Sequence, residues 1–287
     1  MAIRLLVCGL GYSGAATAAE AARRGWRVAG TARDPLRAEA PSGVAVIAFA
    51  EAAPAIAEAT HLFVTAPPDE AGDPVLAAHG DAVRAAVARG SLRWVGYVST
   101  TGVYGDRGGA AVEETTPPAP GQERSRRRLA AEEAWRGAAR GAALDLLRAG
   151  GIYGPGRSPF DELRAGTARR VVKPGRAFSR IHRDDIAVAA CAAIAQDAPP
   201  GVRVLHLVDD EPAESAAVVE EAARLLGVAP PPALPFEEAR TRMSPMALSF
   251  WAENRRVGNA RTKAALGIAW RYPTYREGLR AILDAEA

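Results

Sequence analysis

The sequence predicts an α/β protein: a Rossmann-type, doubly wound parallel sheet with a smaller C-terminal substrate lobe. Two observations predict this fold. Short apolar runs alternate with helical stretches through the first half of the chain, and a glycine-rich segment joins the first run to the first helix. The 287 residues, 48% hydrophobic and 24% charged, suffice for a core of this size.

Each strand is expected at an apolar run, and each helix at an Ala-rich or periodic stretch that ends near a glycine. The expected strands span residues 3–8, 26–32, 44–49, 62–66, 92–99, 143–148 and 202–208. The expected helices span residues 13–24, 74–89, 122–139 and 184–196. This βαβ alternation indicates that the strands run parallel.

Two stretches interrupt the alternation. Residues 154–180 are rich in Gly, Pro and Arg, and residues 229–250 contain repeated prolines. We therefore assign residues 1–155, completed by 181–209, to the Rossmann domain. Residues 156–180 and 210–287 are assigned to the smaller lobe, over the carboxyl edge of the sheet.

The segment Gly9-Leu10-Gly11-Tyr12-Ser13-Gly14 follows the first strand and opens the first helix. In this context a G-x-G-x-x-G motif binds a dinucleotide, because its glycines allow a tight turn and close approach of the pyrophosphate. The helix N-terminus adds free N–H groups and a favourable dipole. We predict NAD(P) binding through Gly9, Gly11, Tyr12, Ser13 and Gly14. An ordinary glycine-rich turn is the alternative.

The end of the second strand, Gly30-Thr31-Ala32-Arg33-Asp34, bears on the choice of cofactor. An acidic residue there would bind the ribose 2′-hydroxyl and favour NAD. Ala32 stands where that acid is expected, and the guanidinium of Arg33 can pair with a 2′-phosphate. We predict NADP, bound through Arg33. In the alternative, NAD binds, and Asp34, which lies later in the sequence than the expected acid position, holds the ribose. Arg33 is then a solvated surface residue.

Four further segments carry a resemblance to a known family; they lie at residues 98–105, 147–156, 181–187 and 207–212. Together with the glycine loop they resemble the extended short-chain dehydrogenase/reductases, the NAD-dependent epimerase/dehydratase family, over nearly the whole chain. The glycine spacing departs from the usual pattern, which places the chain nearer the atypical members. The resemblance implies an NADP-dependent oxidoreductase or epimerase-like enzyme acting on a carbonyl or hydroxyl group, with a nucleotide sugar as one candidate substrate.

The resemblance also implies catalytic positions. A Ser or Thr after the fifth strand binds the reacting oxygen; Thr100 matches it, and its neighbour Ser99 is assigned to the cofactor. The family's Tyr-x-x-x-Lys pair falls on Arg124 and Arg128, which share one helix face. Arg128 can hold a ribose hydroxyl or a phosphate. Arg124 is a poor acid–base group, because the pKa of arginine is above ~12. The alternative is a solvated charged helix face over residues 124–128, with Glu132 and Glu133 as i,i+4 partners.

Two tyrosines at the sheet edge, Tyr104 and Tyr153, are further candidates for catalysis. Either hydroxyl could reach a substrate, or either ring could be a packing residue with a satisfied hydroxyl. The resemblance assigns Thr65, Ala66 and Pro67, after the fourth strand, to cofactor contact.

Other parts of the sequence point away from metal, nucleic acid and membrane. The four histidines and two cysteines have no ligand-like spacing, so no metal site is expected. His182 is interpreted as structural, with Asp184 or Asp185 capping the following helix. The basic residues are interleaved with acids rather than concentrated, which disfavours nucleic acid. No apolar run approaches ~20 residues and no signal-peptide pattern is present, so we expect a cytoplasmic protein.

The segment after the sixth strand is rich in basic residues. They are Arg157, Arg164, Arg169, Arg170, Lys173, Arg176, Arg180 and Arg183. A basic pocket would suit a small anionic substrate, although most of these side chains could instead cover the surface. The loss of Tyr-x-x-x-Lys keeps a second hypothesis open: a non-catalytic NADP(H)-binding sensor or regulatory protein. A homodimer is one assembly that the resemblance allows.

Overall fold

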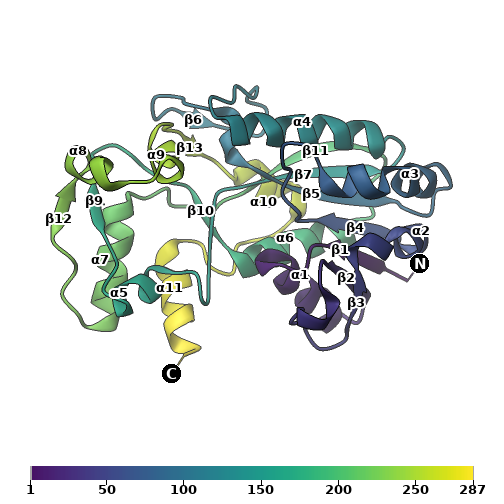
Figure 1. The fold of residues 1–287 in the computed structure, drawn as a ribbon, viewed down its shortest axis with the longest axis horizontal. Coiled ribbons are helices and arrows are strands. Elements are labelled where there is room, and N and C mark those ends of the chain that lie inside the picture. Colours follow the sequence, from purple (N-terminus) through teal and green to yellow (C-terminus); the bar gives the residue numbers. More distant parts are fainter. Residues whose placement is uncertain (1, 287) are drawn as a thin grey trace.

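The computed structural model describes residues 2–286 and confirms the α/β architecture (Figure 1). A single parallel sheet has the strand order β11-β7-β5-β4-β1-β2-β3. Its strands are β1 (Arg4–Cys8), β2 (Arg27–Ala32), β3 (Val44–Ala48), β4 (His61–Val64), β5 (Trp94–Thr100), β7 (Ala143–Ala149) and β11 (Gly201–Leu207). The order reverses between β1 and β4, and ligands of doubly wound folds bind at such a switch point.

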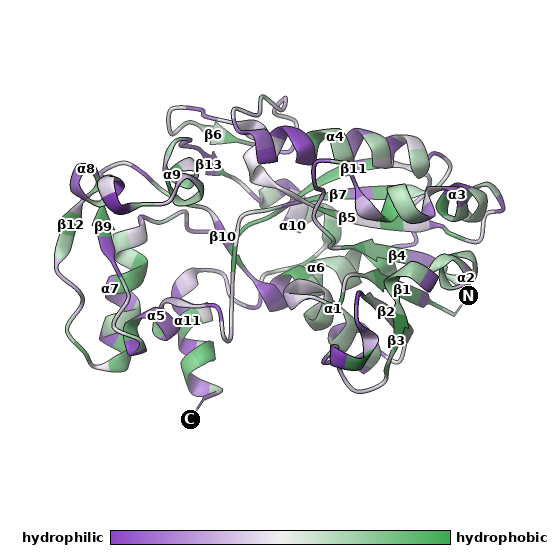
Figure 2. Cartoon of the chain, in the orientation of Figure 1, coloured by the Kyte–Doolittle hydropathy of each residue, from purple (hydrophilic) through white to green (hydrophobic). Residues whose placement is uncertain are grey.

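Both faces of this sheet are covered by helices (Figure 1). Helices α1 (Tyr12–Arg23) and α6 (Arg183–Ala195) pack on one face; α2 (Ala53–Glu58), α3 (Pro74–Ala88) and α4 (Glu123–Ala138) pack on the other. Along β1, alternate residues enter the two cores, which is why the strand reads as a continuous apolar run. The strands are mostly hydrophobic, whereas the start of α4 is hydrophilic (Figure 2).

The rest of the chain forms a lobe of short elements. Its strand pairs are β8 (Gly151–Tyr153) with β10 (Arg180–His182), β9 (Arg170–Val172) with β12 (Ala233–Pro235), and β6 (Ala111–Val112) with β13 (Arg256–Val257). Its helices are α5 (Pro159–Arg164), α7 (Ser215–Leu226), α8 (Phe236–Ala239), α9 (Pro245–Trp251) and α11 (Tyr275–Asp284), while α10 (Ala260–Leu266) packs back toward the sheet. No helix within residues 2–286 is long and apolar enough to cross a membrane.

A buried ion pair fixes α4 against the sheet. Glu132 of α4 is 0% exposed and receives two hydrogen bonds from Arg148 of β7, at 3.0 Å from Nε and 2.7 Å from Nη2. Ser99, at the end of β5, donates to the same carboxylate at 2.5 Å. Arg148 also donates to the Tyr104 hydroxyl at 2.8 Å, and Tyr104 is hydrogen-bonded to His206. Helix α4 is thereby tied to the carboxyl ends of β5 and β7.

Glu132→Gln is expected to lower the free energy of unfolding by about 3–5 kcal/mol, because it leaves the Arg148 charge buried without a counter-charge. Urea unfolding measures this. The matched control is Glu133→Gln, which breaks only the solvent-exposed pair with Arg136 and should change stability by less than about 1 kcal/mol. Equal urea midpoints for Glu132→Gln and the wild type would contradict the structural role of the pair.

Candidate active site

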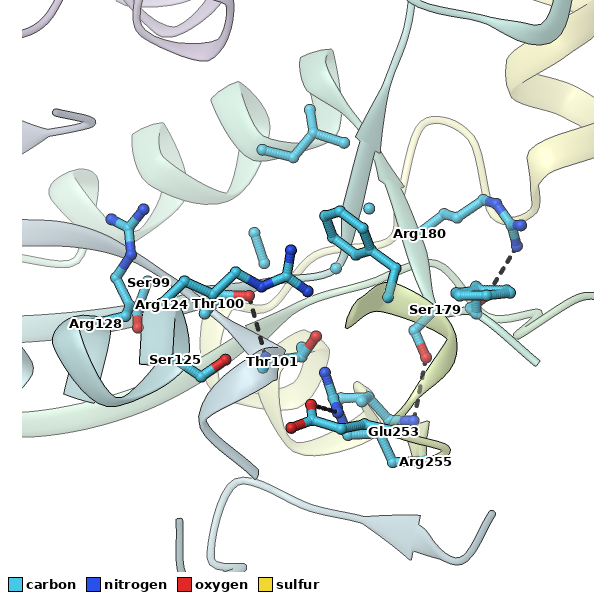
Figure 3. Close-up of a pocket in the computed structure, with 18 of the residues that line it drawn as sticks. Ser99, Thr100, Thr101, Arg124, Ser125, Arg128, Ser179, Arg180, Glu253 and Arg255 are labelled. Atoms are coloured by element: carbon cyan, nitrogen blue, oxygen red, sulfur yellow. Dashed lines mark hydrogen bonds and ion pairs between the residues drawn. The ribbon is translucent and has the colours of Figure 1, made fainter. Parts of the chain in front are cut away.

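A cavity of about 740 Å³ lies where the carboxyl edge of the sheet meets the lobe. It is continuous from the glycine loop, through the end of β5 and the first turns of α4, to the lobe segments around residues 176–180 and 249–257. Its size lies within the range of small-molecule and cofactor sites, about 300–1,000 Å³. Figure 3 shows the part of this cavity between β5, α4 and the lobe.

The glycine loop is shaped to leave its backbone open. Gly9 has a φ of +105°, which favours glycine, and a Cβ on Gly14 would lie 2.0 Å from the Gly9 carbonyl oxygen. A Cβ on Gly11 would meet nothing within 4 Å, so its backbone faces open space in the cavity. No side chain caps the start of α1. These features fit a pyrophosphate held by the helix N-terminus.

Two side chains hold this loop in place. The Thr65 hydroxyl donates to the Gly9 carbonyl oxygen at 2.7 Å. The Tyr12 hydroxyl donates to the Pro155 carbonyl oxygen at 3.1 Å and so joins the glycine loop to the loop after β8. Thr65, Tyr12 and Ser13 all line the cavity.

Other residues predicted to contact the cofactor lie outside the cavity. Ala66 and Pro67 do not line it, and Arg33 is exposed beyond the end of β2. Asp34 is engaged locally: its side chain accepts from the Leu36 amide at 3.1 Å and pairs with Arg37 at 3.5 Å. Arg33 forms no ion pair with any of residues 2–286, so its charge is available to a ligand.

The two arginines at the family's Tyr and Lys positions both line the cavity. Arg128 donates to the Val98 carbonyl oxygen at 2.9 Å, which holds it at the sheet edge. Arg124 extends from α4 into the cavity (Figure 3). Its Cζ lies 3.7 Å from the centroid of the Phe250 ring, so the guanidinium stacks on that ring. The alternative, a solvated helix face paired with Glu132 and Glu133, does not hold for Arg128, because Glu132 is turned inward to Arg148 and Glu133 pairs with Arg136.

Thr100 lies at the cavity wall, at the end of β5. Its Oγ1 accepts a hydrogen bond from the Gly102 amide at 3.1 Å. That bond fixes the side chain and leaves the hydroxyl proton free to be donated into the cavity. Ser99 also lines the cavity, but its hydroxyl donates to Glu132.

Tyr104 and Tyr153 have to be withdrawn as proton donors, because neither lines the cavity. Tyr104 is 0% exposed, and its hydroxyl is held by Arg148 and His206. Tyr153 is 7% exposed and packs in the lobe core, with its hydroxyl turned toward the Thr274 carbonyl oxygen. Both are packing residues with engaged hydroxyls.

The start of α6 is capped differently from the prediction. His182, not Asp184 or Asp185, is the cap: its Nδ1 accepts from the Asp184 amide at 3.2 Å. Asp185 instead accepts the backbone amides of Arg271 and Tyr272. Burial lowers the pKa of His182 to about 4, so the ring is neutral and able to accept at this nitrogen. Its structural role agrees with the sequence interpretation.

The basic segment of the lobe divides between cavity and surface. Arg157, Arg176 and Arg180 line the cavity. Arg164 and Arg170 instead pair with Glu286 and Glu220 at the surface. Residues 2–286 contain no group of three or more His, Cys, Asp or Glu side chains placed to hold a metal ion.

Comparison with known proteins decides the family. No protein-family model matches the chain. Protein YeeZ of Escherichia coli K12 is 31% identical over 244 residues, which cover 79% of this chain and 85% of YeeZ. The structure of a functionally unknown conserved protein from Silicibacter pomeroyi DSS is 44% identical over 99% of both chains, with a TM-score of 0.89.

Other solved structures share the fold over nearly the whole chain. Human epimerase family protein SDR39U1, solved with NADPH, is 20% identical, covers 98% of this chain and 99% of its own, and has a TM-score of 0.77. MoeE5, solved with UDP-glucuronic acid and NAD, is 20% identical with a TM-score of 0.76 and covers 99% of this chain and 100% of its own. The chain belongs to the same family as YeeZ and has the fold of the NAD-dependent epimerase/dehydratases. At 20% identity these last two likenesses show the fold alone.

The structure also contains a buried carboxyl that the sequence did not single out. Asp209, just after β11, is 1% exposed, and neither of its oxygens has a hydrogen-bond partner among residues 2–286. Burial raises the pKa of Asp209 to about 8, with the nearby Arg180 charge opposing the shift. Near neutral pH the carboxyl is therefore largely protonated.

The raised pKa of Asp209 predicts that the free energy of unfolding falls as pH rises from about 4 to about 8. The folded state holds a proton over this range that the unfolded chain, with an Asp pKa of about 3.9, has released. Asp209→Asn should flatten the profile, reducing the loss between pH 5 and 8 by about 1 kcal/mol or more. The control is Asp284→Asn, the same change at an exposed site. Parallel profiles for Asp209→Asn and wild type would contradict the assignment.

Proposed function

We propose that this protein is an NADP-dependent oxidoreductase that acts on a carbonyl or alcohol group of a small anionic substrate. One observation carries the proposal: a single cavity joins the open backbone at Gly11 to the Thr100 hydroxyl. A dinucleotide with its pyrophosphate at the start of α1 would extend its nicotinamide toward β5. When bound, the nicotinamide supplies or accepts a hydride.

The preference for NADP rests on charge at the end of β2. Arg33 is exposed and forms no ion pair within residues 2–286, so it can meet a 2′-phosphate without giving up an existing partner. Asp34, the competing ribose ligand, already accepts from Leu36 and pairs with Arg37. On the nicotinamide side, Arg128 is held at the sheet edge, where it can reach a ribose hydroxyl or a phosphate.

Thr100 is proposed to bind the reacting oxygen. Because its Oγ1 accepts from the Gly102 amide, its own proton points away from that amide and can be donated to a substrate oxygen. With Tyr104 and Tyr153 buried, water supplies or receives the proton in this proposal.

The anionic character of the substrate follows from the cavity walls. Arg124, Arg128, Arg157, Arg176 and Arg180 line it, and none of the five forms an ion pair within residues 2–286. The one acid in the lining, Glu253, is paired with Arg255 at 2.8 Å, so the walls are predominantly positive, and a positive cleft concentrates anionic ligands. A nucleotide sugar and a simpler carboxylate both meet this requirement.

A second candidate is a non-catalytic NADP(H)-binding sensor. Arginine at position 124 favours it, since neither Tyr104 nor Tyr153 lines the cavity and the hydroxyl of Tyr12, which does line it, is donated to the Pro155 carbonyl oxygen. An intact substrate cavity next to Thr100 favours the enzyme.

Arg33→Ala is expected to weaken NADPH binding about tenfold or more and to leave NADH binding unchanged, because only NADPH carries the 2′-phosphate. Calorimetric titration of both cofactors measures this. Arg37→Ala, which removes a neighbouring exposed arginine already paired with Asp34, is the control and should keep NADPH affinity. Equal loss for both cofactors, or none for NADPH, would refute the preference.

Thr100→Val is expected to lower kcat/KM for NADPH-dependent carbonyl reduction by about 10²-fold, since one donor to the reacting oxygen is lost. NADPH affinity should hold. Thr100→Ser, which retains the hydroxyl, should keep most of the activity. A wild-type protein that binds NADPH tightly but turns over no member of a broad panel of anionic aldehydes and ketones would favour the sensor.

A further inference from the structure

A serine beside the reacting end of the cavity has a hydroxyl without a hydrogen-bond partner among residues 2–286. Ser125, in the first turn of α4, is 2% exposed and lines the cavity. Its hydroxyl forms no hydrogen bond with any of residues 2–286. Because this hydroxyl opens onto the cavity and has no protein partner among these residues, its proton can be donated to a ligand atom there. Ser125 lies beside Thr101, on the side of the cavity that carries Thr100 (Figure 3).

Gly102 keeps the space around Ser125 and Thr100 open. A Cβ at position 102 would lie 2.7 Å from Ser125 Oγ and 3.3 Å from Thr100 Oγ1. Any larger residue would therefore crowd both hydroxyls at once. With glycine there, the two hydroxyls flank one small space, and both have a proton to donate into it.

The residue before Ser125 brings a positive charge to the same place. Arg124 forms no ion pair within residues 2–286. The carboxylate with the strongest electrostatic effect on it is Glu253, and one oxygen of Glu253 is already paired with Arg255 at 2.8 Å. Stacking on Phe250 at 3.7 Å holds the guanidinium across the cavity. Partial burial lowers the pKa of Arg124, and the nearby Glu253 opposes the shift. The positive end of the α4 dipole adds to the field.

We propose that Arg124, Ser125 and Thr100 form an oxyanion site that selects anionic carbonyl compounds, with 2-oxo carboxylates as the substrate class. The inference rests on the proposed function. Thr100 and Ser125 donate to the reacting carbonyl oxygen, and Arg124 pairs with the neighbouring carboxylate. Planar guanidinium groups bind carboxylates through two parallel hydrogen bonds.

In the reduction, hydride from NADPH forms the new C–H bond and the C=O π pair becomes a lone pair on oxygen. NADPH becomes NADP⁺, and the alkoxide then takes a proton from water, leaving hydroxide to the buffer. The fixed donors and charge stabilise the alkoxide as it forms, so no tyrosine acid is needed.

Sulfite tests the site without a known substrate. The sulfur of sulfite adds to C4 of oxidised nicotinamide and gives a dihydropyridine adduct that absorbs in the near ultraviolet. In this adduct the anionic sulfite oxygens lie where the oxygen of the reacting group would lie. NADP⁺ affinity is measured first for each protein, and the saturated complex is then titrated with sulfite. We expect Arg124→Gln to raise the sulfite dissociation constant about tenfold or more, and Ser125→Ala about fivefold.

Controls separate this site from folding and from general charge. Arg126→Gln removes a surface arginine of the same helix, paired with Glu123, and should leave the sulfite constant unchanged. Arg124→Lys should recover part of the affinity, and circular dichroism checks the fold of each variant.

Unchanged sulfite binding in Arg124→Gln and Ser125→Ala would overturn the inference, as would the absence of any adduct on a wild-type protein that binds NADP⁺. Failure of the wild type to bind NADP⁺ at all would instead overturn the proposed function, and this inference with it.

Discussion

The arrangement of the site depends on the buried pair between Glu132 and Arg148. Removing two charges from water costs free energy, and burial is tolerated only where the remaining hydrogen-bonding groups are satisfied. Ser99 and Tyr104 satisfy them here, and His206 completes the network on the far side of Tyr104. The pair joins α4 to the ends of β5 and β7, so the side chains of α4 that face the cavity keep a fixed position relative to Thr100. This constraint also explains why Tyr104 is absent from the cavity.

Binding and chemistry are supplied by different elements of the fold. The dinucleotide would be bound mainly by backbone groups, at Gly11 and at the start of α1. The side chains of Thr65 and Tyr12 hold the glycine loop in position. The chemistry is proposed to come from β5 and the first turn of α4, where the family's tyrosine is replaced by Arg124. With arginine at this position, the site has a fixed positive charge where a tyrosine would supply a titratable hydroxyl. An electrostatic site can stabilise a developing oxyanion as effectively as a proton donor, provided its groups are held in place beforehand.

The sheet was predictable because its strands are buried on both faces and therefore appear as apolar runs, each placed within two residues of its observed bounds. The glycine loop was predictable because its strand–turn–helix context is local. A smaller C-terminal lobe was also predicted, but its strands were not, since they are only two or three residues long and carry no period. The roles of Tyr104 and Glu132 depend on partners 102 and 16 residues away, respectively, which no local pattern reveals. The cavity-lining position of Ser125 could not be predicted, because the start of its helix is polar throughout. The capping role of His182 could not be predicted either, because helix caps are usually Ser, Thr, Asp or Asn.

The central claim is that one cavity places a bound NADP nicotinamide beside Thr100 and the first turn of α4. A crystal structure of the NADP⁺ complex tests this most directly. The account predicts the 2′-phosphate within hydrogen-bond distance of the Arg33 guanidinium, and nicotinamide C4 facing the space between Thr100, Arg124 and Ser125, with room for a reacting atom at about 3.5 Å. A cofactor bound with its nicotinamide outside the cavity, or with Arg33 still in solvent, would contradict it.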